Sequence, residues 1–164
     1  MRCSMDKRNM SAVRMYKPQI ETAPRDVIQG LQFRLFKNQI SYVYQHSLMY
    51  RKKYDEVGIE PEDIKTPEDI KKVPFTTKED LRKAQEANPP FGDVLCVPVE
   101  EGVRVFQTSG TTGIPLRVMF TVRDWFGFAC QHIAHQAYGY GIKRSDTVFF
   151  PFGYGLFVAW WAWQ

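Results

Sequence analysis

The sequence has few cysteines, no block of like charge and no apolar run long enough to cross a membrane. Its 3 cysteines form no C-x-x-C pair, which argues against a disulfide framework and favours the cytoplasm. Residues 1–17 are charged throughout and lack the apolar core of a signal peptide. The uncharged stretch 147–163 is broken by Pro151, Gly153 and Gly155, whereas a spanning helix needs about 20 apolar residues. We therefore expect no membrane partner.

The charges are mixed along the chain rather than clustered. The 22 Lys and Arg residues exceed the 18 Asp and Glu residues only slightly, and both signs alternate in segments such as 78–83. This pattern is typical of solvated helix faces and not of a nucleic-acid interface. With 44% hydrophobic residues in 164, the chain can build a core. Its apolar end, with Trp160, Trp161 and Trp163, predicts a truncated chain that associates or forms a homodimer through this surface.

Residues 1–24 are expected to be a flexible basic lead-in, and helical patterns follow. Pro24 precedes an amphipathic helix over residues 25–46, and Ser47 can cap a second helix that Gly58 ends. Residues 66–69 are predicted to start a further helix, and Thr77 with Asp80 forms a capping-box pair. The apolar face expected for the first helix consists of Val27, Leu31, Phe33, Leu35, Ile40, Val43 and Tyr44.

The pattern changes to strands beyond the Asn88-Pro89-Pro90 linker. Residues 103–108 and 116–121 alternate as strands do, and residues 122–138 have helical periodicity, with Trp125, Phe128, Ala129, His132 and Ile133 on its expected face. Asp146 to Phe150 is predicted to be a buried strand. The fold class is therefore α/β, with a helical N-terminal region followed by a mixed sheet flanked by helices.

A hydroxyl-rich loop separates the two alternating strands. Its glycines permit positive φ, successive N–H groups can form an anion-binding nest, and a hydroxyl can also reach Mg²⁺. A Walker A loop is excluded, because a helix and a Lys would have to follow the second glycine. An ordinary hairpin turn remains the alternative, although two residues would close a hairpin. The candidate phosphate-binding residues are Thr108, Ser109, Gly110, Thr111, Thr112 and Gly113.

The segment T-S-G-T-T-G-x-P at residues 108–115 resembles the phosphate-binding signature of the adenylate-forming enzymes. Residues 50–54, 73–82 and 152–157 resemble the phenylacetate–CoA ligase branch, which also contains the coenzyme F390 synthetases. The resemblance runs from about residue 27 to the end. It implies that residues 25–164 are an incomplete N-terminal portion of the AMP-binding domain.

The resemblance also implies a reaction in two steps. A carboxylate attacks the α-phosphate of ATP to give an acyl-adenylate and pyrophosphate, and the thiol of CoA then displaces AMP. The phosphate loop would hold the β- and γ-phosphates with Mg²⁺. In this branch an aromatic segment lines the aryl-acid pocket, although its residues are equally consistent with core aromatics. The corresponding residues are Phe152, Gly153, Tyr154, Gly155 and Phe157.

The sequence departs from the family pattern in two ways. Relatives often carry Lys where Ile114 or Leu116 stands, and Arg117 should point to the opposite face from Leu116. The later family motifs, including the catalytic Lys, are not in this chain, so no catalytic residue is assigned and the chain alone is expected to be inactive. A cofactor-modifying adenylyltransferase and a non-enzymatic binding module remain as alternatives.

Cys130, His132 and His135 are the residues that could suggest a metal site. His132 and His135 are three residues apart and could share a helix face. Zinc sites use three or four ligands at recognised spacings, which this set does not provide. Packed or capping histidines are the interpretation that the sequence favours, and no metal ligand is assigned.

Overall fold

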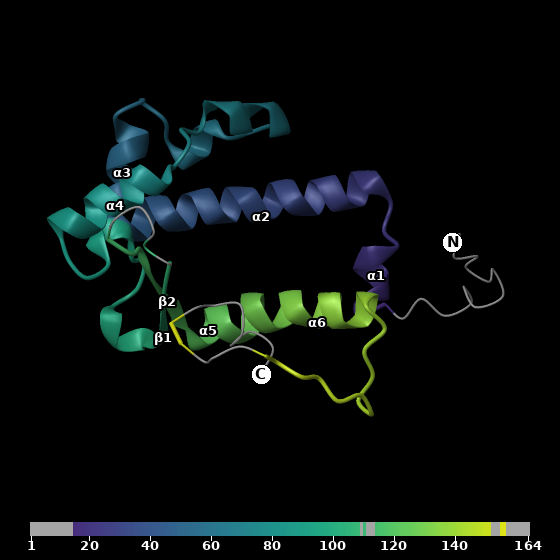
Figure 1. The fold of residues 1–164 in the computed structure, drawn as a ribbon. Helices are drawn as coiled ribbons and strands as arrows, with labels where there is room; N and C mark the ends of the chain where they lie inside the picture. The colour runs from purple at the N-terminus through teal and green to yellow at the C-terminus, as the bar shows by residue number, and fades with distance from the viewer. Residues whose placement is uncertain (1–14, 109, 111–113, 152–154, 157–164) are drawn as a thin grey trace, which may run out of the picture.

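The computed structural model describes residues 15–108, 110, 114–151 and 155–156. Within them, α1 (Pro18–Glu21) precedes the long helix α2 (Arg25–His46), as Figure 1 shows. Pro24 lies at the N-cap of α2, where its fixed φ suits a helix start, and Asp26 favours the first turn through the helix dipole. The predicted helix over 25–46 is confirmed. The described end of the expected lead-in contains α1.

A small core joins α2 to the segments that follow it. Ile40 and Val43 of α2 pack with Tyr54 of α3 (Leu48–Asp55) and with Ile64, and all four are buried. The face of α2 nearer its start is less covered than its pattern predicts, since Val27 is 54% exposed. Burial therefore concentrates at the C-terminal end of α2, beside α3.

Ser47 connects this core to the later chain. Its hydroxyl oxygen accepts the N–H of Tyr50 at the start of α3, and its hydroxyl donates to the carbonyl of Asp93 at 3.0 Å. The predicted cap is therefore confirmed, and the same side chain, only 1% exposed, joins α3 to η4 (Gly92–Val94). A buried hydroxyl that both donates and accepts a hydrogen bond fixes how the elements it joins are oriented, in a contact that is otherwise apolar.

Short capped helices lead from α3 to the sheet. The 3₁₀ helices η2 (Pro61–Asp63) and η3 (Pro67–Lys72) each begin with Pro, and α4 (Lys78–Ala87) begins with the predicted capping box. In that box Thr77 N–H donates to Asp80 Oδ2 at 2.8 Å, and Asp80 N–H donates to Thr77 Oγ1 at 3.2 Å. A further 3₁₀ helix, η5 (Val99–Glu101), follows η4 and precedes the first strand.

The two alternating segments form an antiparallel hairpin. Strand β1 (Gly102–Gln107) pairs with β2 (Arg117–Thr121), and the register places Val105 opposite Met119 and Gln107 opposite Arg117. Both strands were predicted. Where a mixed sheet was expected, the described residues contain this two-stranded antiparallel sheet.

The prediction of a buried strand over Asp146–Phe150 is wrong. These residues have no regular secondary structure, and Phe149 is 83% exposed. A strand needs a neighbour to pair its N–H and C=O groups. The described part of the chain provides no strand at this position, so the apolar composition alone does not produce one.

The predicted helix after the hairpin forms with an internal irregularity. It consists of α5 (Val122–Asp124), a π-helical segment η6 (Trp125–Ala129) and α6 (Cys130–Gly139). Its capping box, Thr121 with Asp124, fixes the first turn. The π segment shifts the apolar spacing, so Phe128 is exposed, contrary to the expected face, whereas Ala129 is buried.

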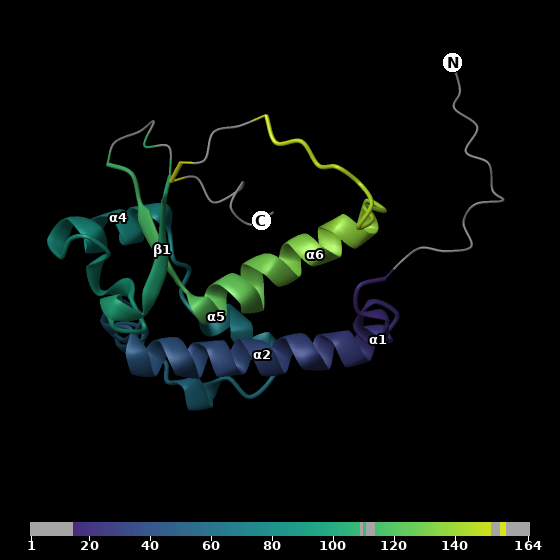
Figure 2. The same cartoon turned by 90° about the horizontal axis from the view of Figure 1, so that it is seen from below.

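In both views, α2 and α6 extend from the hairpin towards α1, with the hairpin at one end and α1 at the other (Figures 1 and 2). Tyr16 donates its hydroxyl proton to Gln131 Oε1 at 3.1 Å, which joins the N-terminal segment to α6. No helix among residues 15–108 and 114–151 is long and apolar enough to cross a membrane.

Candidate phosphate loop and adjoining acid-pocket segment

The loop between the strands is closed at its base by Thr108 and Leu116. The N–H of Thr108 donates to the carbonyl of Leu116 at 2.9 Å, and Thr108 Oγ1 accepts the N–H of Leu116 at 3.1 Å. These two bonds extend the hairpin one step beyond β1 and β2. The loop therefore emerges from a fixed base, and the Thr108 hydroxyl oxygen already has a structural hydrogen bond.

Besides Thr108 at the base, Gly110 is the predicted phosphate-binding residue that the structure describes. Its φ is +66°, in the left-handed region that favours glycine. An N–H in such a turn can point inward and contribute to an anion-binding nest. The other predicted phosphate-binding residues, Ser109, Thr111, Thr112 and Gly113, lie outside the described residues.

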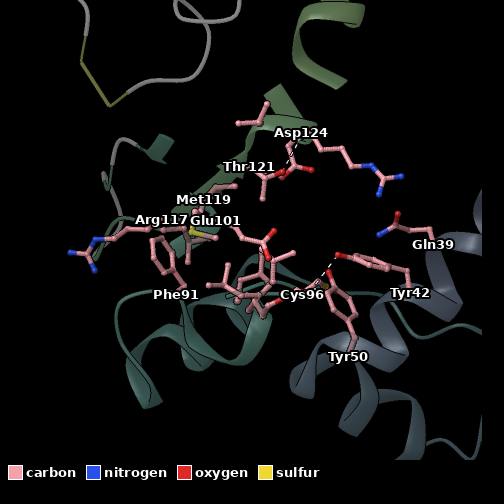
Figure 3. A pocket seen from close by; sticks show the side chains of 18 of the residues that line it. Gln39, Tyr42, Tyr50, Phe91, Cys96, Glu101, Arg117, Met119, Thr121 and Asp124 are labelled. Atoms are coloured by element: carbon pink, nitrogen blue, oxygen red, sulfur yellow. Dashed lines mark hydrogen bonds between the residues drawn. The ribbon is translucent and has the colours of Figure 1, made fainter. Parts of the chain in front are cut away.

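The exit of the loop carries no cation at the two positions that the family resemblance singles out. Ile114 is exposed and Leu116 is buried. Arg117, the next residue, is exposed and is among the residues that line the neighbouring groove, and its guanidinium extends away from the other labelled side chains (Figure 3). The opposite orientation of Leu116 and Arg117 stays a prediction. Beside the exit, Arg82 and Glu86 of α4 line a small cavity together with residues 114–117.

The second predicted site lies next to the base of the loop. Gln107, the last residue of β1, donates its N–H to the carbonyl of Leu156 at 2.9 Å. Leu156 and Gly155 belong to the aromatic segment predicted to line the acid pocket, of which Phe152, Gly153, Tyr154 and Phe157 lie outside the described residues. The loop base and the acid-pocket segment, nearly 50 residues apart, are therefore neighbours, which no sequence pattern indicated.

A groove of about 1410 Å³ lies on the other side of β2, between α2, residues 91–97 and α5 (Figure 3). Burial raises the pKa of the Cys96 thiol, and Asp124 adds to the effect, so the thiol stays protonated and is a poor nucleophile. Burial likewise raises the pKa of Tyr42, whose hydroxyl donates to the Cys96 carbonyl at 3.5 Å. The groove therefore presents no activated nucleophile at these two residues.

The two histidines of α6 have protein partners. His135 Nδ1 lies 2.8 Å from the carbonyl of Gln131 and His135 Nε2 lies 3.7 Å from Glu21 Oε1, while His132 Nε2 lies 2.9 Å from Gln136 Nε2. Within the described ranges no three His, Cys, Asp or Glu side chains are grouped to hold a metal. Their observed contacts are those of capping and packing residues.

Comparison with known proteins gives the class of the fold. No protein-family model matches the chain. A 2-hydroxyisobutyryl-CoA ligase, solved in its postadenylation state with 2-HIB-AMP, superposes with a TM-score of 0.80 and 31% sequence identity, covering 94% of this chain and 32% of that one. The same ligase in its thioesterification state, with 2-HIB-AMP and CoA, gives 0.79 and 34% over 89% of this chain and 31% of that one. The fold is that of the adenylate-forming CoA ligases.

Within that class, the sequence matches phenylacetate-coenzyme A ligases. The Thermus thermophilus enzyme is 38% identical over 144 residues, which are 88% of this chain and 31% of the relative. The Escherichia coli enzyme is 39% identical over 139 residues, which are 85% of this chain and 30% of that relative. The resemblance to the phenylacetate–CoA ligase branch is therefore confirmed. The chain spans about a third of the length of the relatives it matches.

Proposed function

We propose that this chain supplies the ATP phosphate loop and part of the acid pocket of an AMP-forming acid–CoA ligase. The observation that carries the proposal is the segment at residues 108–115, closed at its base by the two Thr108–Leu116 hydrogen bonds. Its support from relatives is that the matched chains are CoA ligases. Residues 25–164 would then form the first part of the AMP-binding domain.

In the proposed reaction, the chain's own residues act on the pyrophosphate half of ATP. An oxygen of the carboxylate forms a bond to the α-phosphorus, and the bond to the β-phosphate oxygen breaks, which releases pyrophosphate. The CoA thiol then gives up its proton, its sulfur bonds to the acyl carbon, and the bond from that carbon to the phosphate oxygen of AMP breaks, which releases AMP. Oriented donors in residues 108–113 would stabilise the charge that develops on the leaving pyrophosphate.

The described part of the loop fits a phosphate ligand. Gly110 at φ +66° suits a nest of N–H donors, and the segment from Thr108 to Thr112 adds hydroxyl groups. Mg²⁺, when bound, would neutralise phosphate charge, and the hydroxyls at Thr111 and Thr112 are the loop groups that suit it. Because Ile114 and Leu116 are uncharged, backbone N–H groups and hydroxyls would carry the binding in this chain.

The acid would lie beside the loop, against the aromatic segment. The hydrogen bond from Gln107 to Leu156 joins the base of the loop to one described residue of the aromatic segment, which supports a shared site for acid and ATP. Phe152 and Phe157 would contact an aryl ring by edge-to-face packing. The named relatives differ in their acids, phenylacetate in one case and 2-hydroxyisobutyrate in the other. We propose the aryl acid.

A chimera tests the function directly. The segment of the T. thermophilus ligase that matches this chain is replaced by the chain, and acid-dependent exchange between ATP and labelled pyrophosphate is measured with phenylacetate and with 2-hydroxyisobutyrate. We expect exchange with phenylacetate, and at least tenfold loss in a chimera with Gly110→Ala, since Cβ disfavours this φ. A native chimera that folds but exchanges with neither acid would refute the function. Exchange with 2-hydroxyisobutyrate alone would refute the aryl acid.

The 164-residue chain by itself should give no exchange with either acid. It spans about a third of each relative, and residues that these relatives contribute from the remainder would be missing. The parallel assay of the isolated chain at the same protein concentration checks this expectation. Acid-dependent exchange above the protein-free background would contradict it.

A further inference from the structure

Gln85 of α4 makes two hydrogen bonds to the backbone at the exit of the loop. Its Nε2 donates to the carbonyl of Arg117 at 2.7 Å, and its Oε1 accepts the N–H of Arg117 at 3.0 Å. One side-chain amide thus satisfies both polar groups of a residue 32 positions later in the chain. It occupies the outer edge of β2 as a neighbouring strand would.

The entrance of the loop is held in the corresponding way. Gln107, which pairs in register with Arg117, donates its N–H outward to the carbonyl of Leu156. At this level of the hairpin, therefore, Leu156 occupies the outer edge of β1 and Gln85 that of β2. Beyond them, only the Thr108–Leu116 pair remains before the loop begins.

Helix α4 is well placed to transmit a fixed position to the loop. Its start is held by the Thr77–Asp80 capping box and by an ion pair from Lys53 of α3 to Asp80. The end of α4 lies close to Gly92, and a β-carbon added to Gly92 would lie 2.9 Å from the backbone nitrogen of Gln85. Gln85 therefore projects from a helix whose two ends are both anchored.

The composition of the loop makes the hydrogen bonds from Gln85 to Arg117 important for ligand binding. Attraction to a lysine ammonium falls off only gradually with distance. Hydrogen bonds from N–H and hydroxyl groups weaken steeply once they are misaligned. Ile114 and Leu116 are uncharged and Pro115 has no N–H, so in this chain the orientation of the loop decides its affinity.

We propose that Gln85 is a positioning residue for phosphate binding, which fixes the exit of the loop through the backbone of Arg117. This inference rests on the proposed function, in which residues 108–113 hold the phosphates of ATP. Gln85 itself need not touch the nucleotide. A cavity of about 320 Å³ beside it is lined by Arg82, Gln85, Glu86, Pro89 and residues 114–117.

The test is titration of the 164-residue chain with magnesium pyrophosphate by isothermal calorimetry. Gln85→Ala should weaken binding about tenfold, the scale seen for supporting partners of ligand-binding groups. Gln29→Ala, the same substitution at an exposed position of α2, is the matched control and should bind as the native chain does. Circular dichroism verifies that each variant retains the native helix content.

Gln85→Glu separates positioning from general structural loss. A carboxylate can accept from the Arg117 N–H but repels its carbonyl, whereas the protonated acid offers a donor and an acceptor as the amide does. Its affinity relative to the native chain should therefore recover as the pH falls from 7 to 4, through the ordinary glutamate pKa of about 4.3. Arg82, Glu86 and Arg117 are the charged residues around this position, so the ratio to the native chain is taken at each pH.

The outcomes distinguish the two proposals. If the native chain does not bind pyrophosphate, the proposed function fails and this inference fails with it. If the native chain binds and Gln85→Ala binds within twofold of it, the inference alone is overturned. Should Gln85→Ala lose its helix content, Gln85→Glu decides: recovery at low pH supports positioning, and an unchanged deficit at every pH overturns it.

Discussion

At the scale of single residues, Asp80 links local capping to tertiary structure. Its carboxylate accepts from Lys53 Nζ of α3 and from the N–H of Thr77. The Lys53 hydrogen bond, followed by those from Thr77, lowers the pKa of Asp80 to about 2. Because the folded pKa lies below the ordinary value of 3.8, Asp80 stabilises the fold above that value. The stabilisation is lost as the pH falls towards 2.

Asp80→Asn should therefore lower the urea midpoint at pH 7 and flatten its decline between pH 4 and pH 2. Lys53→Met keeps the titrating carboxyl and the Thr77 hydrogen bonds but removes the ion pair, so its pH dependence should be intermediate. Urea unfolding followed by circular dichroism at pH 7, 4, 3 and 2.5 measures all three proteins. Equal slopes for the native chain and Asp80→Asn would show that Asp80 does not contribute in this way.

At the scale of elements, Gly92 determines how η4 packs against α4. Its φ is +71°, and an added β-carbon would lie 2.6 Å from the backbone carbon and oxygen of Ala84. Gly58, at the end of α3, has a φ of +67° with open space around it. Both glycines therefore have a left-handed φ, but only Gly92 lies so close to another backbone segment that a β-carbon would clash.

Gly58→Ala should cost about 1 kcal/mol of unfolding free energy, the strain of a left-handed residue. Gly92→Ala should cost about 3 kcal/mol or more, because backbone atoms of α4 cannot move aside as a flexible side chain can. Denaturant unfolding of both variants gives the difference. Equal losses would mean that the contact with Ala84 relaxes without penalty.

Elements defined by local chemistry were predictable from the sequence. Pro24, Ser47 and the Thr77–Asp80 pair are cap signals that act within a few residues, and each marks an observed helix boundary. The strand predicted over 146–150 failed because strand formation depends on a partner elsewhere in the chain. The π segment was missed for a related reason, since helical periodicity does not distinguish one wider turn.

The residues of the candidate loop were predictable from the sequence, but the hydrogen bonds that hold the base of the loop were not. The signature at 108–115 is contiguous, so the sequence alone points to it. The hydrogen bond from Gln107 to Leu156 and the hydrogen bonds from Gln85 to Arg117 join segments that are far apart in sequence. Gln85 lies in a helix rich in charged residues, and nothing in the neighbouring sequence indicates that it binds the backbone of Arg117. Only the fold brings these groups together.

At the scale of the whole molecule, the described surface exposes several large aromatic side chains. Phe128 of η6 is 68% exposed, Phe126 is 62% exposed and Phe149 is 83% exposed. The chain matches about a third of each relative, and an apolar surface of this kind is typical of contacts with other protein. We therefore expect the isolated chain to associate, in agreement with the association predicted from its apolar C-terminal sequence.

Sedimentation velocity over a hundredfold range of concentration should show this association as a rising sedimentation coefficient. A variant with Ser at positions 126, 128 and 149 should associate at least tenfold more weakly, because burial of one such ring contributes about 1.5–3 kcal/mol. Phe75→Ser is the control, since Phe75 is 93% exposed but lies on a separate segment before α4. A native chain that stays monomeric throughout would contradict the expectation, and an equal effect of Phe75→Ser would show that Phe126, Phe128 and Phe149 do not define the contact.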